Sequence, residues 1–474
     1  MKGNRVLIAN RGEIAIRVAK ALNELGLVSV GVWTDNEPEA AHLEYCQEWV
    51  HLPGSSNRET YLNVPRLLDL IKAHRIDAVH PGYGFLSENG EFAKTLKEKG
   101  VVFIGPNPDA IAAMGDKAIS KQWAQKAGVP VVPGSTGEVP TVEEAIKLCN
   151  QIGYPVLLKA VAGGGGKGMR PCYSDAEVKA NFEAVQREAL SSFGNAGLLV
   201  EKYVQNPHHI EVQILADKKG NVYHLFEREC SIQRRHQKII EEAPSPFIGA
   251  DEKLRREICE TAVKLAKAVG YDSAGTVEFI MGDDRKFYFL EMNTRIQVEH
   301  PITEEITGID LLANMVKGAF GEPLDFKSQD DIKLHGHAIE CRICAEDPIT
   351  MLPAPGKIAG FETTFPQGIR FDHCLYPKFT ITADFDPMVG KLIARGYNRD
   401  VAIRKTRAAL EGLLIDGLKT NIPLLKVILA EEKFCAGDYT THYIAGVKPQ
   451  EKVAVAGPVQ EFMSKIASIE LGQV

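Results

Sequence analysis

The stretch TVEFIMGDDRKFYFLEMNTRIQVEHP, Thr276–Pro301, carries the most structural information in this sequence. Two apolar runs flank GDDR, which predicts a β-hairpin with its turn at Asp284–Arg285. In that register Glu278 lies directly across from Glu291. Polar residues then occupy every second position, so an extended chain would present one polar face made of Glu291, Asn293, Arg295, Gln297 and Glu299.

Two facing carboxylates on a buried hairpin need a counter-charge, because like charges directly across a strand pair are destabilising. A divalent cation such as Mg²⁺ satisfies this need, since it binds one or two carboxylates and leaves room for phosphates. We therefore expect Glu278, Glu291 and Asn293 to hold Mg²⁺, with Mn²⁺ as the alternative ion. The competing interpretations are one protonated carboxyl group, or a register that separates the two acids.

The rest of the polar face suits phosphoryl transfer, which depends on metal, cations and alignment. Arg295 is a fixed cation that can meet developing negative charge. Glu299 is placed to take a proton. The whole face is therefore interpreted as the wall of an active site.

A glycine-rich loop in LLKAVAGGGGKGM is a second candidate element. Gly163–Gly166 carry no side chains, so their N–H groups can approach an anion closely. Lys159 and Lys167 add positive charge, although the spacing is not that of a Walker loop. We interpret the segment as a phosphate-binding loop that closes as a lid. A loop that is flexible and binds nothing is the alternative.

Three further stretches contribute candidates. Lys117 in MGDK either meets a phosphate or lies solvated on a helix. Glu201 and Lys202 end the strand LLVEK, whose apolar walls and backbone groups suit a purine. The basic run QRRHQK, residues 233–238, is either a site for small anions or a solvated face.

Composition limits the class of protein. A chain of 474 residues, 45% hydrophobic and 25% charged, is typical of several globular domains. The net charge of −7 argues against a nucleic-acid-binding surface, and no apolar run is long enough to span a bilayer. The chain shows no secretory signal, and its nine scattered cysteines suit reduced thiols in the cytoplasm. The CxxC pair Cys341 and Cys344 lacks a second pair, which argues against zinc.

The N-terminal segment alternates strands with helices. Four runs predict the strands of a doubly wound parallel sheet, namely RVLIA (Arg5–Ala9), VSVGVW (Val28–Trp33), DAVHPGYGF (Asp77–Phe85), which continues into a glycine-rich turn, and VVFIG (Val101–Gly105). The first turn, ANRGEIA, has one glycine where a dinucleotide fingerprint needs three. The sequence therefore favours a parallel α/β domain that does not bind NAD.

Together these stretches resemble the biotin carboxylase component of biotin-dependent carboxylases, a branch of the ATP-grasp superfamily. The resemblance covers nearly the whole chain and rests on IANRGEIAIR, HPGYGFLSEN, FIGP, MGDK, GGGGKGM, CSIQRRHQK, EMNTRIQVEHPITE and GHAIECRI. It implies a doubly wound N-terminal α/β domain at 1–113 and an ATP-grasp domain at 114–331, with a mobile glycine-loop lid at 132–203. A mixed α+β C-terminal domain at 332–447 follows. The tail, 448–474, has apolar residues at helical spacing and is interpreted as an amphipathic helix that packs against the rest of the chain or, as the alternative, docks to a partner.

The resemblance also implies a role for each site residue. Bicarbonate would lie at Lys238, Arg295, Gln297 and Val298, with Glu299 as its base, while Tyr83 and Arg342 would orient biotin. Bicarbonate would attack ATP to give carboxyphosphate, whose phosphate then deprotonates biotin, and Arg295 would stabilise the biotin enolate. ATP would contact Lys117, Lys159, Gly164, Gly165, Gly166, Lys167, Gly168, Met169, Glu201, Lys202, Val204, His209, Gln233 and His236.

One departure from the family pattern concerns the biotin pocket. Cys344 stands where the family usually has asparagine, and Glu340, Arg342 and Cys344 share one face of a predicted strand. If Arg342 faces the site, Cys344 is expected to face it too.

The resemblance implies a ligase that carboxylates biotin carried by a separate protein. No biotin-attachment motif appears, so we expect a stand-alone, cytoplasmic, homodimeric subunit that works with a biotin carboxyl carrier protein and a carboxyltransferase subunit. Its assembly would be an acyl-CoA carboxylase, with acetyl-CoA as the default acceptor, or a pyruvate or 2-oxoglutarate carboxylase. We expect neither nucleic acid nor a membrane as partner. The alternatives are an ATP-grasp carboxylate–amine ligase and a catalytically silent scaffold.

Overall fold

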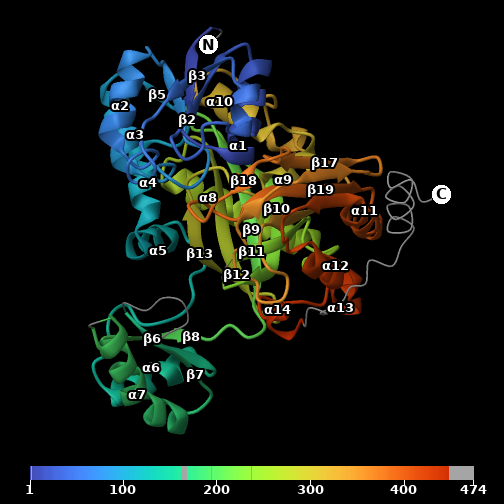
Figure 1. Cartoon of the computed structure of the whole chain (residues 1–474). Helices are drawn as coiled ribbons and strands as arrows, with labels where there is room; N and C mark the ends of the chain where they lie inside the picture. Colours follow the sequence, from blue (N-terminus) through green and yellow to red (C-terminus); the bar gives the residue numbers. More distant parts are fainter. Residues whose placement is uncertain (2, 162–167, 194, 236, 448–474) are drawn as a thin grey trace, which may run out of the picture.

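The computed structural model describes residues 1, 3–161, 168–193, 195–235 and 237–447. They form an N-terminal layered unit, a small unit set apart from the rest, and a large body built on one long sheet (Figure 1). This arrangement confirms the predicted multidomain α/β and α+β fold.

The N-terminal unit is a parallel sheet in the order β3-β2-β1-β4-β5. Along β1, Val6 and Ile8 enter one hydrophobic cluster and Leu7 enters another, so both faces of the sheet are covered. The doubly wound prediction is confirmed. The half-exposed strand β3 was not predicted. The elements are β1 (Arg5–Ile8), α1 (Gly12–Glu24), β2 (Val28–Trp33), η1 (Ala41–Tyr45), β3 (Glu48–His51), α2 (Val64–Ala73), β4 (Ala78–His80), α3 (Gly90–Glu98) and β5 (Val102–Phe103).

Two helices, α4 (Pro108–Gly115) and α5 (Lys117–Lys126), lead out of this unit. The Asp116 side chain accepts hydrogen bonds from the N–H groups of Ala118 and Ile119. This cap satisfies backbone donors at the start of α5 and fixes Lys117 at its first position.

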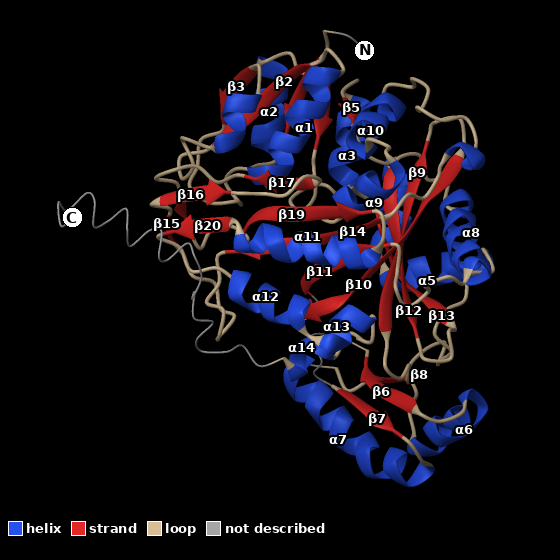
Figure 2. Cartoon of the chain, turned by 90° about the vertical axis from the view of Figure 1, so that its right-hand side faces the viewer, coloured by secondary structure: helices blue, strands red, loops and turns tan. Residues whose placement is uncertain are grey.

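The small unit, called the lid here, has a three-stranded antiparallel sheet in the order β7-β6-β8. Leu158, Cys172 and Val200 belong to a hydrophobic cluster of its own. Figures 1 and 2 both show the lid at the lower edge of the molecule, and Figure 1 shows it apart from the large body. Its elements are α6 (Val142–Ile152), β6 (Val156–Ala160), β7 (Met169–Cys172), α7 (Asp175–Phe193) and β8 (Leu198–Lys202).

The large body is built on an eight-stranded antiparallel sheet in the order β13-β12-β9-β10-β11-β14-β19-β17. Strand β11 pairs with β14, so the sheet continues across the predicted boundary at residue 331. Ile240 and Ile339 share one hydrophobic cluster on either side of this join. The strands are β9 (His208–Ala216), β10 (Val222–Arg234), β11 (Gln237–Ala243), β12 (Ala274–Met281), β13 (Phe287–Asn293), β14 (His337–Cys344), β17 (Ile369–His373) and β19 (Met388–Gly396).

Helices cover this sheet. Helix α8 (Glu252–Ala268) packs on β9 and β10, while α9 (His300–Thr307) and α11 (Arg399–Glu411) pack on β14 and β19. The helices of the described ranges include none with the length and apolar character needed to cross a bilayer. The predicted helix in 448–474 lies outside the described residues. The remaining elements are α10 (Leu311–Ala319), η2 (Gln329–Asp331), β15 (Gly356–Lys357), β16 (Gly360–Thr363), β18 (Thr380–Ile381), β20 (Leu413–Asp416), α12 (Ile422–Ala430), α13 (Glu432–Ala436) and α14 (Tyr443–Gly446).

Candidate active site

A cavity of about 1050 Å³ lies between the large sheet and the lid. The start of α5, the lid strands β6 and β8, and strands of the large sheet all contribute side chains to its wall. The structure brings most of the predicted site residues together here, namely Lys117, Lys159, Glu201, His209, Gln233, Lys238, Glu278, Glu291, Asn293, Arg295, Gln297, Val298, Glu299 and Arg342.

A row of three carboxylates crosses the sheet at this cavity. Glu211 on β9, Glu278 on β12 and Glu291 on β13 are direct cross-strand neighbours. The predicted Glu278–Glu291 pair is present, but its register arises differently. The strand pairing centres the turn on Asp284, and an extra residue at Leu290 then shifts β13 so that Glu278 faces Glu291.

Arg228 on β10 closes the buried end of this row. Its Nε donates to Glu211 Oε1 at 2.5 Å, and its other nitrogens donate to side chains at 2.6–3.0 Å. The side chain is fully buried. Burial alone would lower the pKa of Arg228, but the charge of Glu211 raises it. Glu211 therefore has a permanent counter-ion.

Lys238 on β11 is the second cation of the cluster. Its Nζ lies 2.5 Å from Glu211 and 2.5 Å from Glu299. Glu278 and Gln297 accept from the same nitrogen at 3.1 and 3.0 Å. Burial opposes its charge, yet the three carboxylates raise the pKa of Lys238 well above its ordinary value. An ammonium has three protons, so these four acceptors already use all of them.

Glu299 is ionised in this setting. Its second oxygen accepts from Arg342 Nη2 at 2.9 Å, and the residue is 1% exposed. Burial would raise the pKa of Glu299, but Lys238 and Arg342 hold it well below its ordinary value. It is a carboxylate able to take a proton, and it becomes a stronger base when those cations turn to another anion.

Glu291 and Glu278 form a fitting donor set for a divalent cation. Burial and the neighbouring charge of Glu278 raise the pKa of Glu291, which has no hydrogen-bond or ion-pair partner among the described residues. Burial opposes ionisation of Glu278 too, but Lys238 and His209 hold its pKa well below its ordinary value. An unpaired acid beside an ionised one suits an ion that prefers oxygen ligands.

Asn293 lies beside these acids. Its Nδ2 donates to Glu278 Oε1 at 2.9 Å, while its Oδ1 accepts from Arg295 Nη2 at 2.7 Å. His209 Nε2 lies 3.1 Å from Glu278. The Asn293 oxygen therefore points at Arg295 in this arrangement, and it would have to leave Arg295 to bind a metal.

Arg295 is held from two domains. Besides Asn293, it contacts Glu88 Oε2 of the N-terminal unit through Nε at 3.1 Å, and the Ile296 carbonyl at 3.3 Å. Its guanidinium lines the cavity. The arginine is thus fixed before any substrate arrives, which is the condition for a strong electrostatic effect on a developing charge.

One part of the hairpin prediction is wrong. Strand β13 ends at Asn293, and residues 294–299 are irregular before α9 begins at His300. The polar residues therefore do not share one extended ribbon. They still line a single cavity, because the chain turns along its wall instead of continuing the sheet.

A second cavity of about 350 Å³ adjoins the first and holds Tyr83 and Arg342 on its wall. Gln237, Val298 and Arg342 line both cavities. The Tyr83 hydroxyl donates to Glu13 on α1. Burial and the charge of Glu13 raise the pKa of Tyr83 well above its ordinary value, so the hydroxyl stays protonated. The structure thus places both predicted biotin-orienting residues together, next to Val298.

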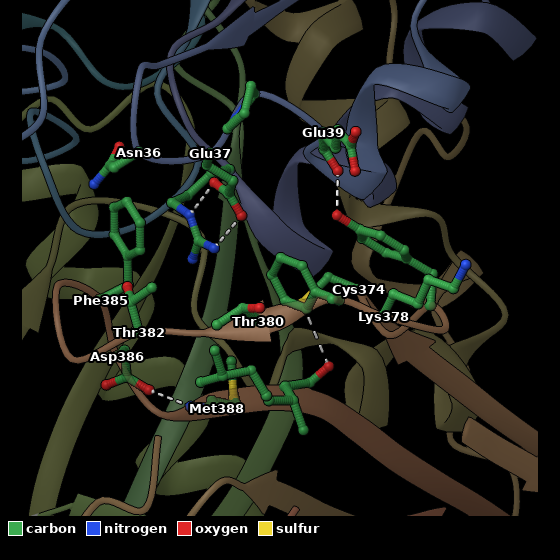
Figure 3. A pocket seen from close by; sticks show the side chains of 16 residues that line it. Asn36, Glu37, Glu39, Cys374, Lys378, Thr380, Thr382, Phe385, Asp386 and Met388 are labelled. Carbon is green, nitrogen blue, oxygen red and sulfur yellow. Dashed lines mark hydrogen bonds and ion pairs between the residues drawn. The ribbon is translucent and has the colours of Figure 1, made fainter. Parts of the chain in front are cut away.

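A third cavity of about 180 Å³ lies between the N-terminal unit and the β18–β19 connection (Figure 3). Arg11 and Glu37 pair on its wall. The Phe385 ring lies 3.8 Å from the Arg11 guanidinium carbon, and both residues also line the second cavity. Arg11 and Phe385 therefore form the partition between the two cavities.

The lid residues fall into two groups. Glu201 Oε1 and Oε2 lie 3.6 Å from Lys121 and 3.4 Å from Lys159. The next residue on β8, Lys202, points the other way and donates to the carbonyls of Gly153 and Tyr154. Of the predicted ATP-binding residues on the described part of the lid and hinge, Gly168, Met169, Lys202 and Val204 do not line the large cavity. Gly164, Gly165, Gly166, Lys167 and His236 lie outside the described residues.

Cys344 does not face the site, contrary to expectation. It ends β14, where the pairing with β19 shifts after Ile343 so that Cys344 lies across from Met388. Arg342 lines the two larger cavities, whereas Cys344 is buried and lines none of the three cavities. Burial raises the pKa of its thiol. The irregular register separates two side chains that a regular strand would place on one face.

Two residues that contact the site, Glu211 and Glu88, were not predicted from the sequence. Glu211 could have been found, because HHIEVQILA places His209, Glu211 and Gln213 on one face of a strand. Glu88 gave no local signal, because its contact with Arg295 joins residues 207 positions apart.

Comparison with known proteins matches three family models to the chain. They describe the N-terminal domain of biotin carboxylase at residues 2–111, the ATP-binding domain of the carbamoyl-phosphate synthase L chain at 116–327, and the C-terminal domain of biotin carboxylase at 340–446. Biotin carboxylase 2 of Bacillus subtilis is 48% identical over 93% of this chain and 98% of its own. The propionyl-CoA carboxylase alpha chain of Ruegeria pomeroyi is 47% identical over 94% of this chain and 68% of its own.

A solved structure is similar over the same span. The biotin carboxylase domain dimer of Hydrogenobacter thermophilus 2-oxoglutarate carboxylase, in complex with MgADP, ADP and bicarbonate, has a TM-score of 0.84 and 47% identity. The match covers 94% of this chain and 98% of that one.

Proposed function

This chain belongs to the biotin carboxylase family, and on that premise we propose which of its residues carry the reaction. The protein is an ATP-grasp ligase that uses ATP, Mg²⁺ and bicarbonate to carboxylate biotin. We infer that the side chains lining the two larger cavities carry out the individual steps.

The nucleotide is proposed to lie in the large cavity, between the lid and the row of acids. Lys117 and Lys159 would contact its phosphates, and Glu201 would lie at the adenine end. The glycine loop is proposed to contact the phosphates too, and its residues 162–167 lie outside the described residues. Glu278, Glu291 and Asn293 would hold Mg²⁺, which neutralises phosphate charge when bound. Glu278 and Glu291 support this assignment, because one is ionised and the other has no partner among the described residues.

Bicarbonate is proposed to bind between Lys238 and Arg295. It competes with Glu299 for the Lys238 ammonium, which frees the Glu299 carboxylate to take the bicarbonate proton. A bicarbonate oxygen then attacks the γ-phosphorus of ATP, the bond from that phosphorus to the β,γ-bridging oxygen breaks, and ADP leaves. The product is carboxyphosphate.

Biotin is proposed to enter the second cavity, where Tyr83 and Arg342 orient it. Carboxyphosphate breaks its C–O bond to give CO₂ and phosphate. The phosphate takes the ureido N–H proton of biotin, and the resulting nitrogen nucleophile bonds to the carbon of CO₂. Arg295 stabilises the negative charge that develops on the ureido oxygen.

The observation that carries this proposal is the position of Lys238 and Glu299. They lie 2.5 Å apart in the large cavity, and their chain neighbours Gln237 and Val298 line the second cavity as well. A generic ATP-grasp ligase needs the acids and the glycine loop, but it has no use for this pair beside a second pocket.

The test is ATP hydrolysis by the whole protein with Mg²⁺ and free biotin, with and without bicarbonate. We expect phosphate release to depend on bicarbonate, radiolabelled bicarbonate to appear in carboxybiotin, and Glu299→Gln to abolish both. Lys426→Met, which removes a surface ion pair with Glu411, serves as the matched control. Turnover that ignores bicarbonate and biotin would instead support a carboxylate–amine ligase. Wild-type ATP hydrolysis in Glu299→Gln would mean that the active site lies elsewhere.

We propose that the protein works in the cytoplasm as a homodimer, divided at 1–113, 114–331 and 332–447. Its partners would be a biotin carboxyl carrier protein and a carboxyltransferase subunit of an acyl-CoA or 2-oxoacid carboxylase. The range of relatives supports this, since they include an acyl-CoA and a 2-oxoacid carboxylase. Co-purification with a biotinylated protein, followed by an acceptor screen with acetyl-CoA, propionyl-CoA, pyruvate and 2-oxoglutarate, tests the assignment.

A further inference from the structure

Lys391 is a buried cation next to Val298 and Arg342, two residues that line both the large cavity and the second cavity. It lies on β19, is fully buried, and lines none of the three cavities. Its direct cross-strand neighbour on β14 is Arg342. Two like charges in this position repel each other, so each needs its own acceptors.

The two cations face different partners. Arg342 donates to Glu241 at 2.6 Å and to Glu299 at 2.9 Å, on the side of the large cavity. Lys391 Nζ donates to the Val298 carbonyl at 2.8 Å and lies 3.2 Å from Glu13 Oε2. A lysine is almost never fully buried without such pairing.

Each partner of Lys391 leads to a different substrate pocket. Val298 lines both cavities and immediately precedes Glu299, the proposed base. Glu13 comes from α1 of the N-terminal unit, and its other oxygen accepts the hydroxyl of Tyr83. One ammonium therefore fixes the backbone beside the proposed bicarbonate site and, through Glu13, the hydroxyl of the proposed biotin site.

The other acids near Lys391 do not take over this role. Asp372, its cross-strand neighbour on β17, is bound to Arg370 at 2.6 Å. Glu340 on β14 is buried, and neither of its carboxyl oxygens has a hydrogen-bond partner among the described residues. Burial raises the pKa of Glu340 well above its ordinary value, so it is neutral. Burial raises the pKa of Glu13 as well, but the charge of Lys391 opposes that shift. Glu13 and the Val298 carbonyl are therefore the remaining close partners of Lys391.

We propose that Lys391 is a positioning residue that couples the two substrate pockets, by holding the Val298–Glu299 backbone and the Tyr83 hydroxyl in a fixed relation. The proposal rests on the function proposed above. Its effect would be to align biotin with the place where CO₂ is released, without any contact between Lys391 and a substrate.

The test uses Lys391→Met in the whole protein, with kcat and KM for free biotin and the Kd of MgADP as readouts. We expect kcat/KM for biotin to fall about tenfold or more, because the hydrogen bond to the Val298 carbonyl and the ion pair with Glu13 are both lost. MgADP affinity is expected to stay within about twofold, since no nucleotide contact changes. Lys391→Arg is expected to recover part of the loss.

A matched control separates positioning from stability. Arg255→Met removes another buried ion pair, with Glu227 at 2.9 Å, and Arg255 lines none of the described cavities. We expect it to lower the unfolding temperature while kcat/KM for biotin stays near that of the wild type. If Lys391→Met and Arg255→Met lose kcat/KM to the same degree, the role of Lys391 is only structural.

A double-mutant cycle with Tyr83→Phe tests the route through Glu13. If Lys391 acts through Tyr83, the double variant should lose less kcat/KM than the product of the fold-losses of the two single variants. Fully independent losses would overturn the coupling. Should Lys391→Met fail to fold, Glu13→Gln replaces it in the same cycle. An inactive wild type would refute the proposed function, whereas an active wild type with unaffected variants would refute only the coupling.

Discussion

Replacing Lys238 with methionine removes the shared counter-ion of three buried acids. Lys238 Nζ lies within 3.1 Å of oxygens of Glu211, Glu278 and Glu299. Removing one partner of a buried ion pair costs about 3–5 kcal/mol, because the remaining charge is left uncompensated. Arg228 still pairs with Glu211, and Arg342 still pairs with Glu299. Glu278 loses its main cation and, within the described part of the chain, keeps only His209, 3.1 Å away, so we expect a single such cost rather than three.

The unfolding free energy lost in Lys238→Met should be larger at high pH than at low pH. In the wild type, Glu278 and Glu299 have lowered pKa values despite their burial. They therefore stabilise the fold above their unfolded pKa of about 4.3, and that contribution is lost as pH falls through their folded values. Without Lys238, only His209 remains among the described residues as a nearby cation to oppose the burial of Glu278, so the pKa of Glu278 rises relative to the wild type. The stability cost of the ionised Glu278 in the variant is therefore largest at high pH, and it decreases as Glu278 takes up a proton.

Denaturant titrations at pH 8 and pH 5.5 would measure this difference. We expect Lys238→Met to lose about 3–5 kcal/mol of unfolding free energy at pH 8, less at pH 5.5, and all bicarbonate-dependent phosphate release. Lys426→Met is the control, because its 2.8 Å ion pair with the exposed Glu411 should contribute less than about 1 kcal/mol. A loss in Lys238→Met no larger than in the control, or one that grows on acidification, would refute the reasoning.

Three further changes have expected outcomes. Arg295→Ala should lower kcat for biotin carboxylation by roughly 10²–10³-fold while MgADP binding, measured by calorimetry, stays near the wild-type value; equal losses would contradict the role of Arg295. Glu291→Gln should raise the Mg²⁺ concentration needed for half-maximal activity, and an unchanged Mg²⁺ titration would remove Glu291 from the metal site. Burial would raise the pKa of Glu242, but His337 and Arg399 lower it to about 2. Glu242→Gln should therefore cost about 3 kcal/mol at pH 7, and this difference should fade between about pH 5 and pH 2 in thermal melts.

The sequence predicted the acid pair because a hairpin is a local structure. Glu278 and Glu291 are joined by one short turn, so alternation and turn chemistry were enough to bring them together. The turn was predicted to centre between Asp284 and Arg285, whereas the strand pairing centres it on Asp284. The extra residue at Leu290 restores the predicted pairing of Glu278 with Glu291. Bulges of this kind leave no reliable mark in a single sequence, as the position of Cys344 also shows.

Long-range pairing explains what the sequence could not predict. Glu211 meets Glu278 only because β9 lies beside β12, and Glu88 meets Arg295 only because the N-terminal unit packs against the end of β13. Lys391 looks like an ordinary polar residue in the apolar strand VGKLIA. Its importance depends on Glu13 and Val298, which come from two other parts of the chain.

The eight-stranded sheet limits how this enzyme can be divided. Because β11 pairs with β14, a fragment that began at residue 332 would leave the backbone N–H and C=O groups of β14 without partners along one full edge. Such a fragment should associate through that edge, and exchanging it with a relative's segment would succeed only if the Ile240–Cys341 alignment were kept. For protein engineers, the practical place to cut or graft is therefore around the lid, whose own hydrophobic cluster gives it an independent core.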